Sequence, residues 1–311
     1  MEIRKKILFL SLLSCYGLVQ ATPITLTGSF IKTGVNDVGT LGSGFSTSPG
    51  LLFDPTGTGN YASNNDYLTP GTPYDYFGVR SNQTGLVGNS NSFVTNLITT
   101  VSGPTNLSSG STLSASWSGT FDNLFNITNT YTFNDTSQRI NVSTSITALQ
   151  DLTNLQFARS IDPDPDVNTF GIFNTINSLG NTGLGIPTTD LAYALGAKTG
   201  LPLGLFTNST FEHNAGIIAD WGGPSSSAAD PTAILAGINN GDGDYALGLG
   251  FNLGDILAGR TISFDYDYVL GLDKGSIDVP PSSVPLPASL PLMSSALGLF
   301  GFGAMRRRNK S

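Results

Sequence analysis

Residues 124–161 read LFNITNTYTFNDTSQRINVSTSITALQDLTNLQFARSI, and this stretch decides the fold. In its middle segment, RINVSTSITA (139–148), apolar residues at 140, 142 and 146 share one face, and polar residues at 141, 143 and 145 share the other. The turn sequences NDTS (134–137) and LQDL (149–152) divide the stretch into three segments. We therefore predict a three-stranded antiparallel meander with one solvated face.

The same alternation recurs along the chain, and no helical period of any length is evident. Further strands are predicted at 24–30, 92–101, 112–121, 245–251 and 261–270. Residues 188–198 suit a short helix capped by Thr189 or Asp190, with a strand as the alternative. The Gly, Pro, Asn and Ser density at 61–73 and 224–231 predicts long loops. The fold class expected is all-β, an antiparallel β-sandwich of two packed sheets.

Composition agrees with short strands joined by tight turns. The 311 residues include 38 Gly, 39% are hydrophobic and only 12% are charged. Seven basic residues lie at the two ends; without them and Glu2, the chain carries 7 basic and 21 acidic side chains. A body this acidic repels polyanions, so nucleic acid is excluded as a partner.

The N-terminus, MEIRKKILFLSLLSCYGLVQATP, has a basic start, an apolar stretch and small residues before the expected cleavage after Ala21. Residues 1–21 are therefore predicted to be a signal peptide, a helix handled by the Sec machinery and signal peptidase. The alternative is a lipoprotein box in which Cys15 is acylated. Cys15 is the only cysteine, so cleavage after Ala21 leaves a mature chain without disulfides.

The C-terminus, VPLPASLPLMSSALGLFGFGAMRRRNKS (284–311), follows a proline-rich spacer. Residues 290–305 lack charge and would span roughly 24 Å as a helix. This is shorter than the hydrocarbon core of a bilayer, about 30 Å, but local thinning of the bilayer can accommodate it. The basic cluster Arg306, Arg307 and Arg308 is expected to stay cytoplasmic. The predicted organisation is a β-sandwich at 22–277, a spacer and motif at 278–289, a transmembrane helix at 290–305 in the inner-membrane lipid, and a basic tail at 306–311.

This three-part tail resembles the PEP-CTERM sorting signal of Gram-negative bacteria. The motif would be Val284, Pro285, Leu286, Pro287 and Ala288, in which Pro-Leu-Pro replaces the usual Pro-Glu-Pro. The resemblance implies an exosortase-type membrane protease as a partner. It also implies export, with the body in the periplasm while the tail is in the inner membrane, followed by release to the cell surface, biofilm or exopolysaccharide matrix.

The body also resembles β-sandwich modules of bacterial surface and adhesin-like proteins. The residues that carry this likeness are the strand ending in ARSIDPDPD (158–166) and the later GDYALGLGF (243–251). The resemblance implies a sandwich of the broad sugar-mutarotase type, or supersandwich. The mutarotase histidines and catalytic glutamate have no counterpart here.

Asp162, Asp164 and Asp166 alternate with two prolines after the third strand of the predicted meander. Extended backbone places these carboxylates on one side, where hard oxygen ligands would suit Ca²⁺. This is not an EF-hand, because Val167 and Phe173 occupy the positions of its glycine and glutamate. The alternative is a rigid strand exit with Arg159 paired to one of the aspartates. No other cofactor is expected.

Three further motifs are interpreted structurally. NNGDGD (239–244) is predicted to be a turn before a strand. His213, the only histidine, has no accompanying nucleophile motif or second histidine for a zinc site. FDYDYV (264–269) predicts three core aromatics alternating with acidic residues, rather than a platform for stacking sugars.

These observations predict an exported surface or matrix protein with a structural or carbohydrate-contacting role and without catalysis, so not an enzyme. An extracellular glycan-active enzyme, a hydrolase or lyase using Asp pairs, is the alternative, because glycosidases need two carboxylates in a groove. A self-assembling surface subunit is a third hypothesis. Extracellular polysaccharide is the expected partner of the first two.

Overall fold

The computed structural model describes residues 22–61, 66–92 and 96–280. This part of the chain is predominantly β, and every ladder between its strands is antiparallel, as predicted. None of its helices is both long and apolar enough to cross a bilayer. The signal peptide with Ala21, the motif at 284–288, the predicted membrane helix at 290–305 and Arg306–Arg308 lie outside the described residues.

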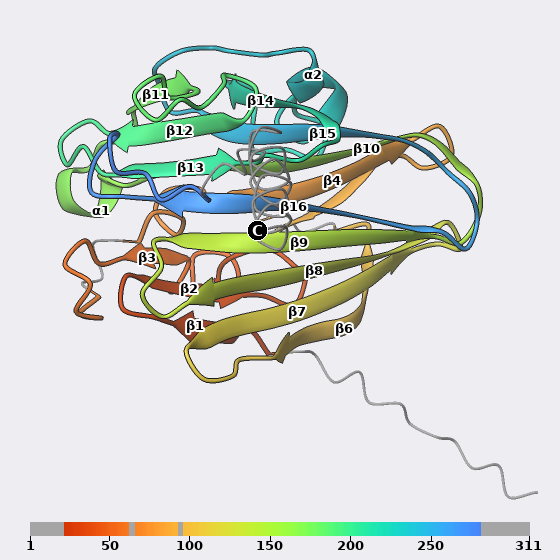
Figure 1. The fold of residues 1–311 in the computed structure, drawn as a ribbon, viewed down its shortest axis with the longest axis horizontal. Coiled ribbons are helices and arrows are strands. Elements are labelled where there is room, and N and C mark those ends of the chain that lie inside the picture. The colour runs from red at the N-terminus through yellow and green to blue at the C-terminus, as the bar shows by residue number, and fades with distance from the viewer. Residues whose placement is uncertain (1–21, 62–65, 93–95, 281–311) are drawn as a thin grey trace, which may run out of the picture. The chain divides into compact units, whose positions relative to one another are not determined.

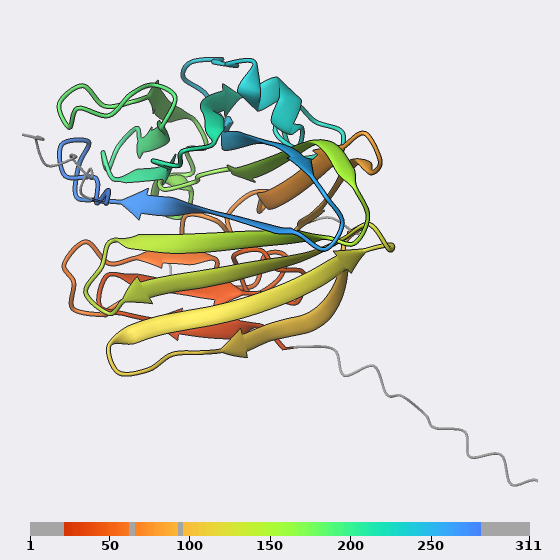
Figure 2. The ribbon, with the colours of Figure 1, turned by 45° about the vertical axis from the view of Figure 1, so that its right-hand side comes forward.

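One sheet has eight strands (Figure 1). Its order is β11 (Thr175–Leu179), β12 (Leu191–Gly196), β13 (Pro202–Phe206), β16 (Thr261–Leu270), β9 (Arg139–Ala148), β8 (Phe125–Asn134), β7 (Thr112–Phe121) and β6 (Thr99–Asn106). Figure 2 shows β7, β8, β9 and β16 side by side as long, twisted strands. In β9 the burial alternates at every residue, because one face packs on the core and the other meets solvent.

Two smaller sheets complete the described part. A five-stranded sheet has the order β14 (Glu212–Ile218), β15 (Ala246–Ile256), β10 (Leu152–Ile161), β4 (Asp75–Ser81) and β5 (Gly85–Ser90). A three-stranded sheet contains β1 (Ile24–Thr27), β2 (Ile31–Val35) and β3 (Leu51–Phe53). The short helices α1 (Val167–Phe170) and α2 (Pro231–Leu235) lie in connections, and Asp230 caps α2 by accepting from the Thr232 amide.

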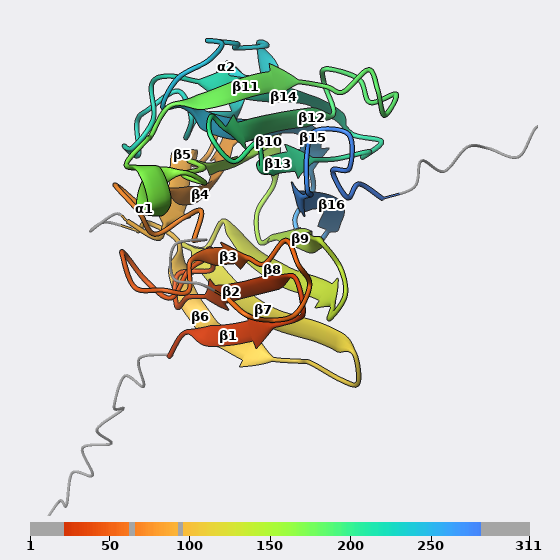
Figure 3. The ribbon, with the colours of Figure 1, turned by 90° about the vertical axis from the view of Figure 1, so that its left-hand side faces the viewer.

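The eight-stranded sheet packs against both smaller sheets through one hydrophobic core. Phe157 on β10 meets Phe264 on β16 with ring centroids 5.0 Å apart, and Phe77 on β4 meets Trp117 on β7 at 5.6 Å. Figure 3 shows β1–β3 lying against β6–β8. Large aromatic side chains supply much of the apolar area that stabilises such a layered core.

The predicted meander is wrong in its third strand. β8 pairs with β9, but β9 pairs next with β16, while β10 joins the other sheet between β15 and β4. The burial of β10 explains the difference, because all residues from Leu155 to Ile161 are buried and neither face could meet water. Asn154, with φ of 54°, and a register shift mark where the chain bends between the layers.

Other strand predictions agree to different degrees. The ranges 112–121, 139–148 and 261–270 match β7, β9 and β16 at both ends. The strand predicted at 92–101 instead begins at Thr99, and 188–198 contains β12 rather than a helix. Both faces of β12 are buried at residues 191–194, so the periodicity of the sequence cannot distinguish this strand from a short helix.

A buried ion pair connects the layers. Arg159 on β10 and Asp75 on β4 are both fully buried, and the guanidinium donates hydrogen bonds to Asp75 and to the hydroxyls of Tyr268 and Tyr131. Tyr268 also donates to Asp75, which accepts the Leu41 amide as well. Burial alone would lower the pKa of Arg159, but Asp75 and the neighbouring tyrosines together outweigh it and raise the pKa, so the guanidinium stays charged.

We predict that Arg159→Met lowers the free energy of unfolding by about 3–5 kcal/mol, because it leaves the Asp75 carboxylate buried without its cation. Urea unfolding measures this loss. Arg80→Met is the matched control, since the Arg80–Asp230 pair is about a third exposed and such pairs contribute only about 0–1 kcal/mol. Equal losses in the two variants would contradict the assignment.

Candidate functional site

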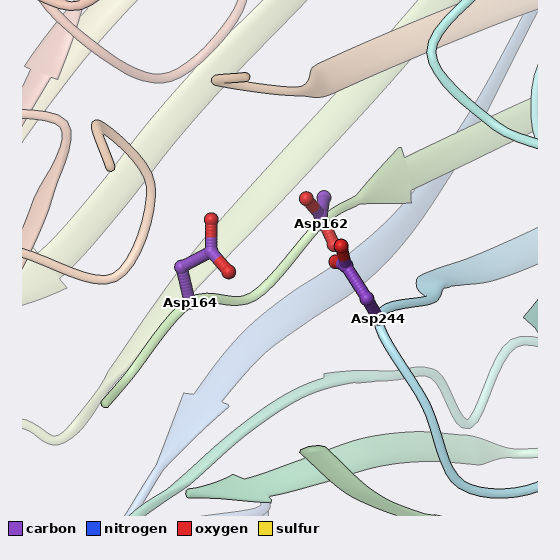
Figure 4. A group of neighbouring side chains, drawn as sticks. All are labelled: Asp162, Asp164 and Asp244. Carbon is purple, nitrogen blue, oxygen red and sulfur yellow. The ribbon is translucent and has the colours of Figure 1, made fainter. Parts of the chain in front are cut away.

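Two of the three predicted aspartates come together with a third that sequence reasoning missed. Asp162 and Asp164 follow β10, and Asp244 lies just before β15, the antiparallel neighbour of β10 (Figure 4). One carboxylate oxygen of each residue lies within 4.8 Å of the others. We call Asp162, Asp164 and Asp244 the aspartate cluster.

The aspartate cluster is largely removed from solvent. Asp162 and Asp164 are each only 2% exposed, and Asp244 is half-buried. Burial, followed by repulsion from Asp244, raises the pKa of Asp164 to about 8. Burial, followed by repulsion from the other two carboxyls, raises the pKa of Asp162 well above its usual range. Like charges at this separation are unfavourable unless a proton or a cation lies among them.

Asp166 does not join the cluster. Its carboxylate accepts hydrogen bonds from the Lys198 amide at 2.6 Å and the Thr199 hydroxyl at 2.7 Å, so it holds the β12–β13 connection. The pairing of Arg159 with an aspartate of 162–166 is wrong, because its partner is Asp75 on the adjacent strand. The sequence does place Asp244 just before a predicted strand. It does not show that this strand pairs with β10, because the two strands are far apart in the chain.

The remaining motifs have clear structural places. In the 239–244 loop Asp242 accepts the Asn177 amide. His213 has partners for both ring nitrogens, the Phe211 carbonyl at 2.7 Å and Asp190 at 3.2 Å. In β16, as the alternation predicts, the three aromatics are buried and Asp265 is exposed, but Asp267 on the outward face is buried, only 4% exposed.

A polar pocket opens on the outward face of the eight-stranded sheet. Its volume is about 280 Å³, and it extends over β7, β8 and β9 and the turn between the last two. We call it the outer-face pocket; its polar lining comes from Thr112, Thr132, Asn134, Ser137, Arg139 and Asn141. Hydroxyl, amide and guanidinium groups of this kind are hydrogen-bonding partners for a hydroxyl-rich ligand.

Two carboxyl groups contact residues that line the outer-face pocket. Asn141 donates to Asp267 at 3.3 Å, and Arg139 forms an ion pair with Asp278. Asp278 also accepts the Gln138 amide at 3.1 Å. The segment carrying Asp278 is fixed by two backbone bonds, Asp278 N to Leu270 O and Leu270 N to Gln138 O. Arg139 and Asp278 are each about 30% exposed.

The two carboxyl groups differ in environment. Burial raises the pKa of Asp267 to about 7, against the opposing effects of the Asn141 hydrogen bond and the Arg139 charge, while Asp265 and Asp278 raise it further. Asp267 therefore retains a proton for part of the time at neutral pH, whereas Asp278 is ion-paired. An acid with a raised pKa close to a second carboxyl group is an arrangement that general acid–base catalysis can use.

No protein-family model and no curated protein match the chain. Among solved structures, it is similar to a bacterial glucoamylase in complex with acarbose, with 9% identity, a TM-score of 0.51 and coverage of 83% of this chain and 34% of that chain. Weaker likenesses are a heparan sulfate lyase from Pedobacter heparinus (8%, TM-score 0.40, 84% and 37% covered) and an aldose epimerase homologue from C. elegans (9%, TM-score 0.40, 80% and 99% covered).

The glucoamylase match is a likeness of fold, and the chain spans about a third of that enzyme's length. It contradicts the prediction of a non-catalytic structural or carbohydrate-contacting protein, and with it the prediction that the chain is not an enzyme, because the shared fold occurs in a glycan-active enzyme.

We predict that Asp267 makes stability depend on pH. Its folded pKa of about 7 exceeds the ordinary value of 3.8, so its contribution to stability is complete below about pH 4 and is lost as the pH rises through 7. Between about pH 4 and 8 the wild type should lose on the order of 4 kcal/mol more than Asp267→Asn. Urea unfolding across this range measures both slopes. Asp122→Asn, which changes an exposed acid in the turn between β7 and β8, should retain the wild-type slope. Identical slopes for wild type and Asp267→Asn would contradict the prediction.

Proposed function

We propose that the protein is an extracellular glycan-active enzyme, a hydrolase or lyase, that binds its substrate at the outer-face pocket. The observation that carries this proposal is a polar pocket of about 280 Å³ in which two lining residues, Asn141 and Arg139, each contact a carboxyl group, Asp267 and Asp278 respectively. The likeness of the fold to that of a glucoamylase supports the same class of substrate.

In a hydrolytic reaction the two carboxyl groups and the two pocket residues that contact them have different roles. Arg139 and Asn141 bind and orient sugar oxygens, Asp267 donates a proton to the oxygen of the leaving sugar, and Asp278 accepts a proton from the attacking water. A sugar that enters must take over the Asn141 amide, because that amide now contacts Asp267. If the substrate is a uronic acid polymer, Arg139 pairs with its carboxylate instead.

We also propose that the fold is a β-sandwich of the supersandwich type. The eight-stranded sheet on one side and the five- and three-stranded sheets on the other are what a β-sandwich of the supersandwich type requires. The length of the large sheet supports this description, because it provides an outward face wide enough for an extended chain of sugars.

Export and sorting complete the proposal. The basic and apolar N-terminus supports secretion, and the order of proline motif, apolar segment and arginine cluster supports sorting by an exosortase-type protease. The enzyme would then act outside the inner membrane, where polysaccharide is accessible.

The catalytic assignment predicts a large loss of activity in two variants. Full-length protein is incubated with neutral glucans and with uronic acid polysaccharides, and reducing ends and unsaturated sugar ends are measured. Asp267→Asn should lower kcat/KM about 10²- to 10⁴-fold and remove the decline in activity above neutral pH, and Asp278→Asn should lower kcat comparably. Asp265→Asn should remain within about twofold of wild type. A wild type inactive on every polymer, or full activity in both variants, would contradict the proposal.

The tail assignment predicts a processed C-terminus. Intact-mass analysis of the protein from its native host should show loss of the residues beyond the 284–288 motif. The variant carrying Pro285→Ala and Pro287→Ala should retain them. A full-length C-terminus in both proteins would mean that the tail is only an anchor.

A further inference from the structure

The aspartate cluster takes no part in the proposed reaction, and its geometry suits a metal ion. Oxygen ligands of Ca²⁺ lie about 2.3–2.6 Å from the ion, so two ligands on opposite sides are about 5 Å apart. The three carboxylate oxygens, all within 4.8 Å of one another, fit around one such ion. They come from two segments that the pairing of β10 with β15 holds together.

A second observation points to a missing ligand. Among the described residues no hydrogen bond or ion pair reaches a carboxylate oxygen of the aspartate cluster. Asp164 is only 2% exposed, and its Oδ1 has no hydrogen-bond partner. Oδ1 of Asp244 is also buried and has no hydrogen-bond partner. Figure 4 shows the Asp164 carboxyl directed toward the other two.

Other buried aspartates in the same fold behave differently. Asp66, 1% exposed, accepts from the Ser48 hydroxyl and from the amides of Gly50 and Leu51. Asp166, also 1% exposed, accepts from the Lys198 amide and the Thr199 hydroxyl. Because buried polar groups are almost always satisfied, two carboxylates with a buried, unpartnered oxygen at one point are best explained by a positive charge beside them.

The backbone around the cluster is fixed in advance. The amides of Asp162 and Asp164 donate to the carbonyls of Tyr74 and Tyr67, both at 2.9 Å, and Trp221 Nε1 donates to the Asp244 carbonyl at 3.0 Å. Little conformational freedom is therefore lost when a ligand binds. Half-buried Asp244 leaves a side from which water can complete the coordination.

We propose that Asp162, Asp164 and Asp244 bind one divalent cation, Ca²⁺ in preference to Mg²⁺. A set made only of carboxylate oxygens favours a hard cation over zinc or copper, and Ca²⁺ tolerates irregular geometry better than Mg²⁺. The ion joins the end of β10 to the start of β15 and stabilises the loop that follows β10 and the loop that precedes β15. This site is separate from the outer-face pocket, so it does not depend on the proposed reaction.

The test uses the full-length protein stripped with a chelator and then supplied with Ca²⁺ or Mg²⁺ at about 1 mM, within the range of extracellular calcium sites. Ca²⁺ should raise the Tm by about 5 °C and Mg²⁺ by less. Isothermal titration calorimetry should give one Ca²⁺ per chain.

Variants separate this site from general effects of charge. Asp164→Asn should abolish the Ca²⁺ response, yet its chelated form should melt higher than the chelated wild type, because repulsion is relieved. If Asp164→Asn does not fold, Asp244→Asn replaces it in the test, because Asp244 is the more exposed ligand. Asp265→Asn should respond like the wild type. No Ca²⁺ binding by the wild type, or an unchanged response in both cluster variants, would overturn the proposal.

Discussion

The buried ion pair of Arg159 and Asp75 is the constraint on which the two layers depend. A guanidinium deep in an aromatic core needs hydrogen-bond partners, and here the partners of Arg159 Nε and Nη2 come from both sides of the core. Asp75 lies on β4 of the five-stranded sheet, while Tyr131 and Tyr268 lie on β8 and β16 of the eight-stranded sheet. Any slip in the register of β10 by one residue would direct Arg159 to the opposite face of its sheet. The pair therefore fixes β10, and β10 in turn fixes where Asp162 and Asp164 emerge.

Alternation of polar and apolar residues predicts the strands that have one solvent-exposed face. Strands β7, β9 and β16 were located at both ends because polar and apolar residues alternate along them. Strands buried on both faces, such as β4 and β13, carry no such pattern, and β10 was placed in the wrong sheet for the same reason. The partner of Arg159 could not be predicted, because Asp75 is 84 residues away in sequence and its strand had not been recognised.

Both sites depend on contacts between distant segments. Sequence spacing found Asp162 and Asp164 but substituted Asp166 for Asp244, since only the pairing of β10 with β15 brings Asp244 near. Alternation placed Asp267 on the outward face, where it would ordinarily be solvated. Its burial follows from its neighbours: Phe206 is its register partner on β13, and Ile277 from the segment after β16 packs with Phe206 in a small apolar cluster. This cover raises the pKa of Asp267 and distinguishes it from exposed Asp265.

The central claim is that a glycan occupies the outer-face pocket, and a crystal structure of the full-length protein with a bound oligosaccharide tests it most directly. We expect a sugar ring over β7–β9, within hydrogen-bond distance of Arg139 and Asn141 and with its glycosidic oxygen facing Asp267. An oligosaccharide bound on another face of the protein, or an empty pocket at saturating concentration, would contradict the account.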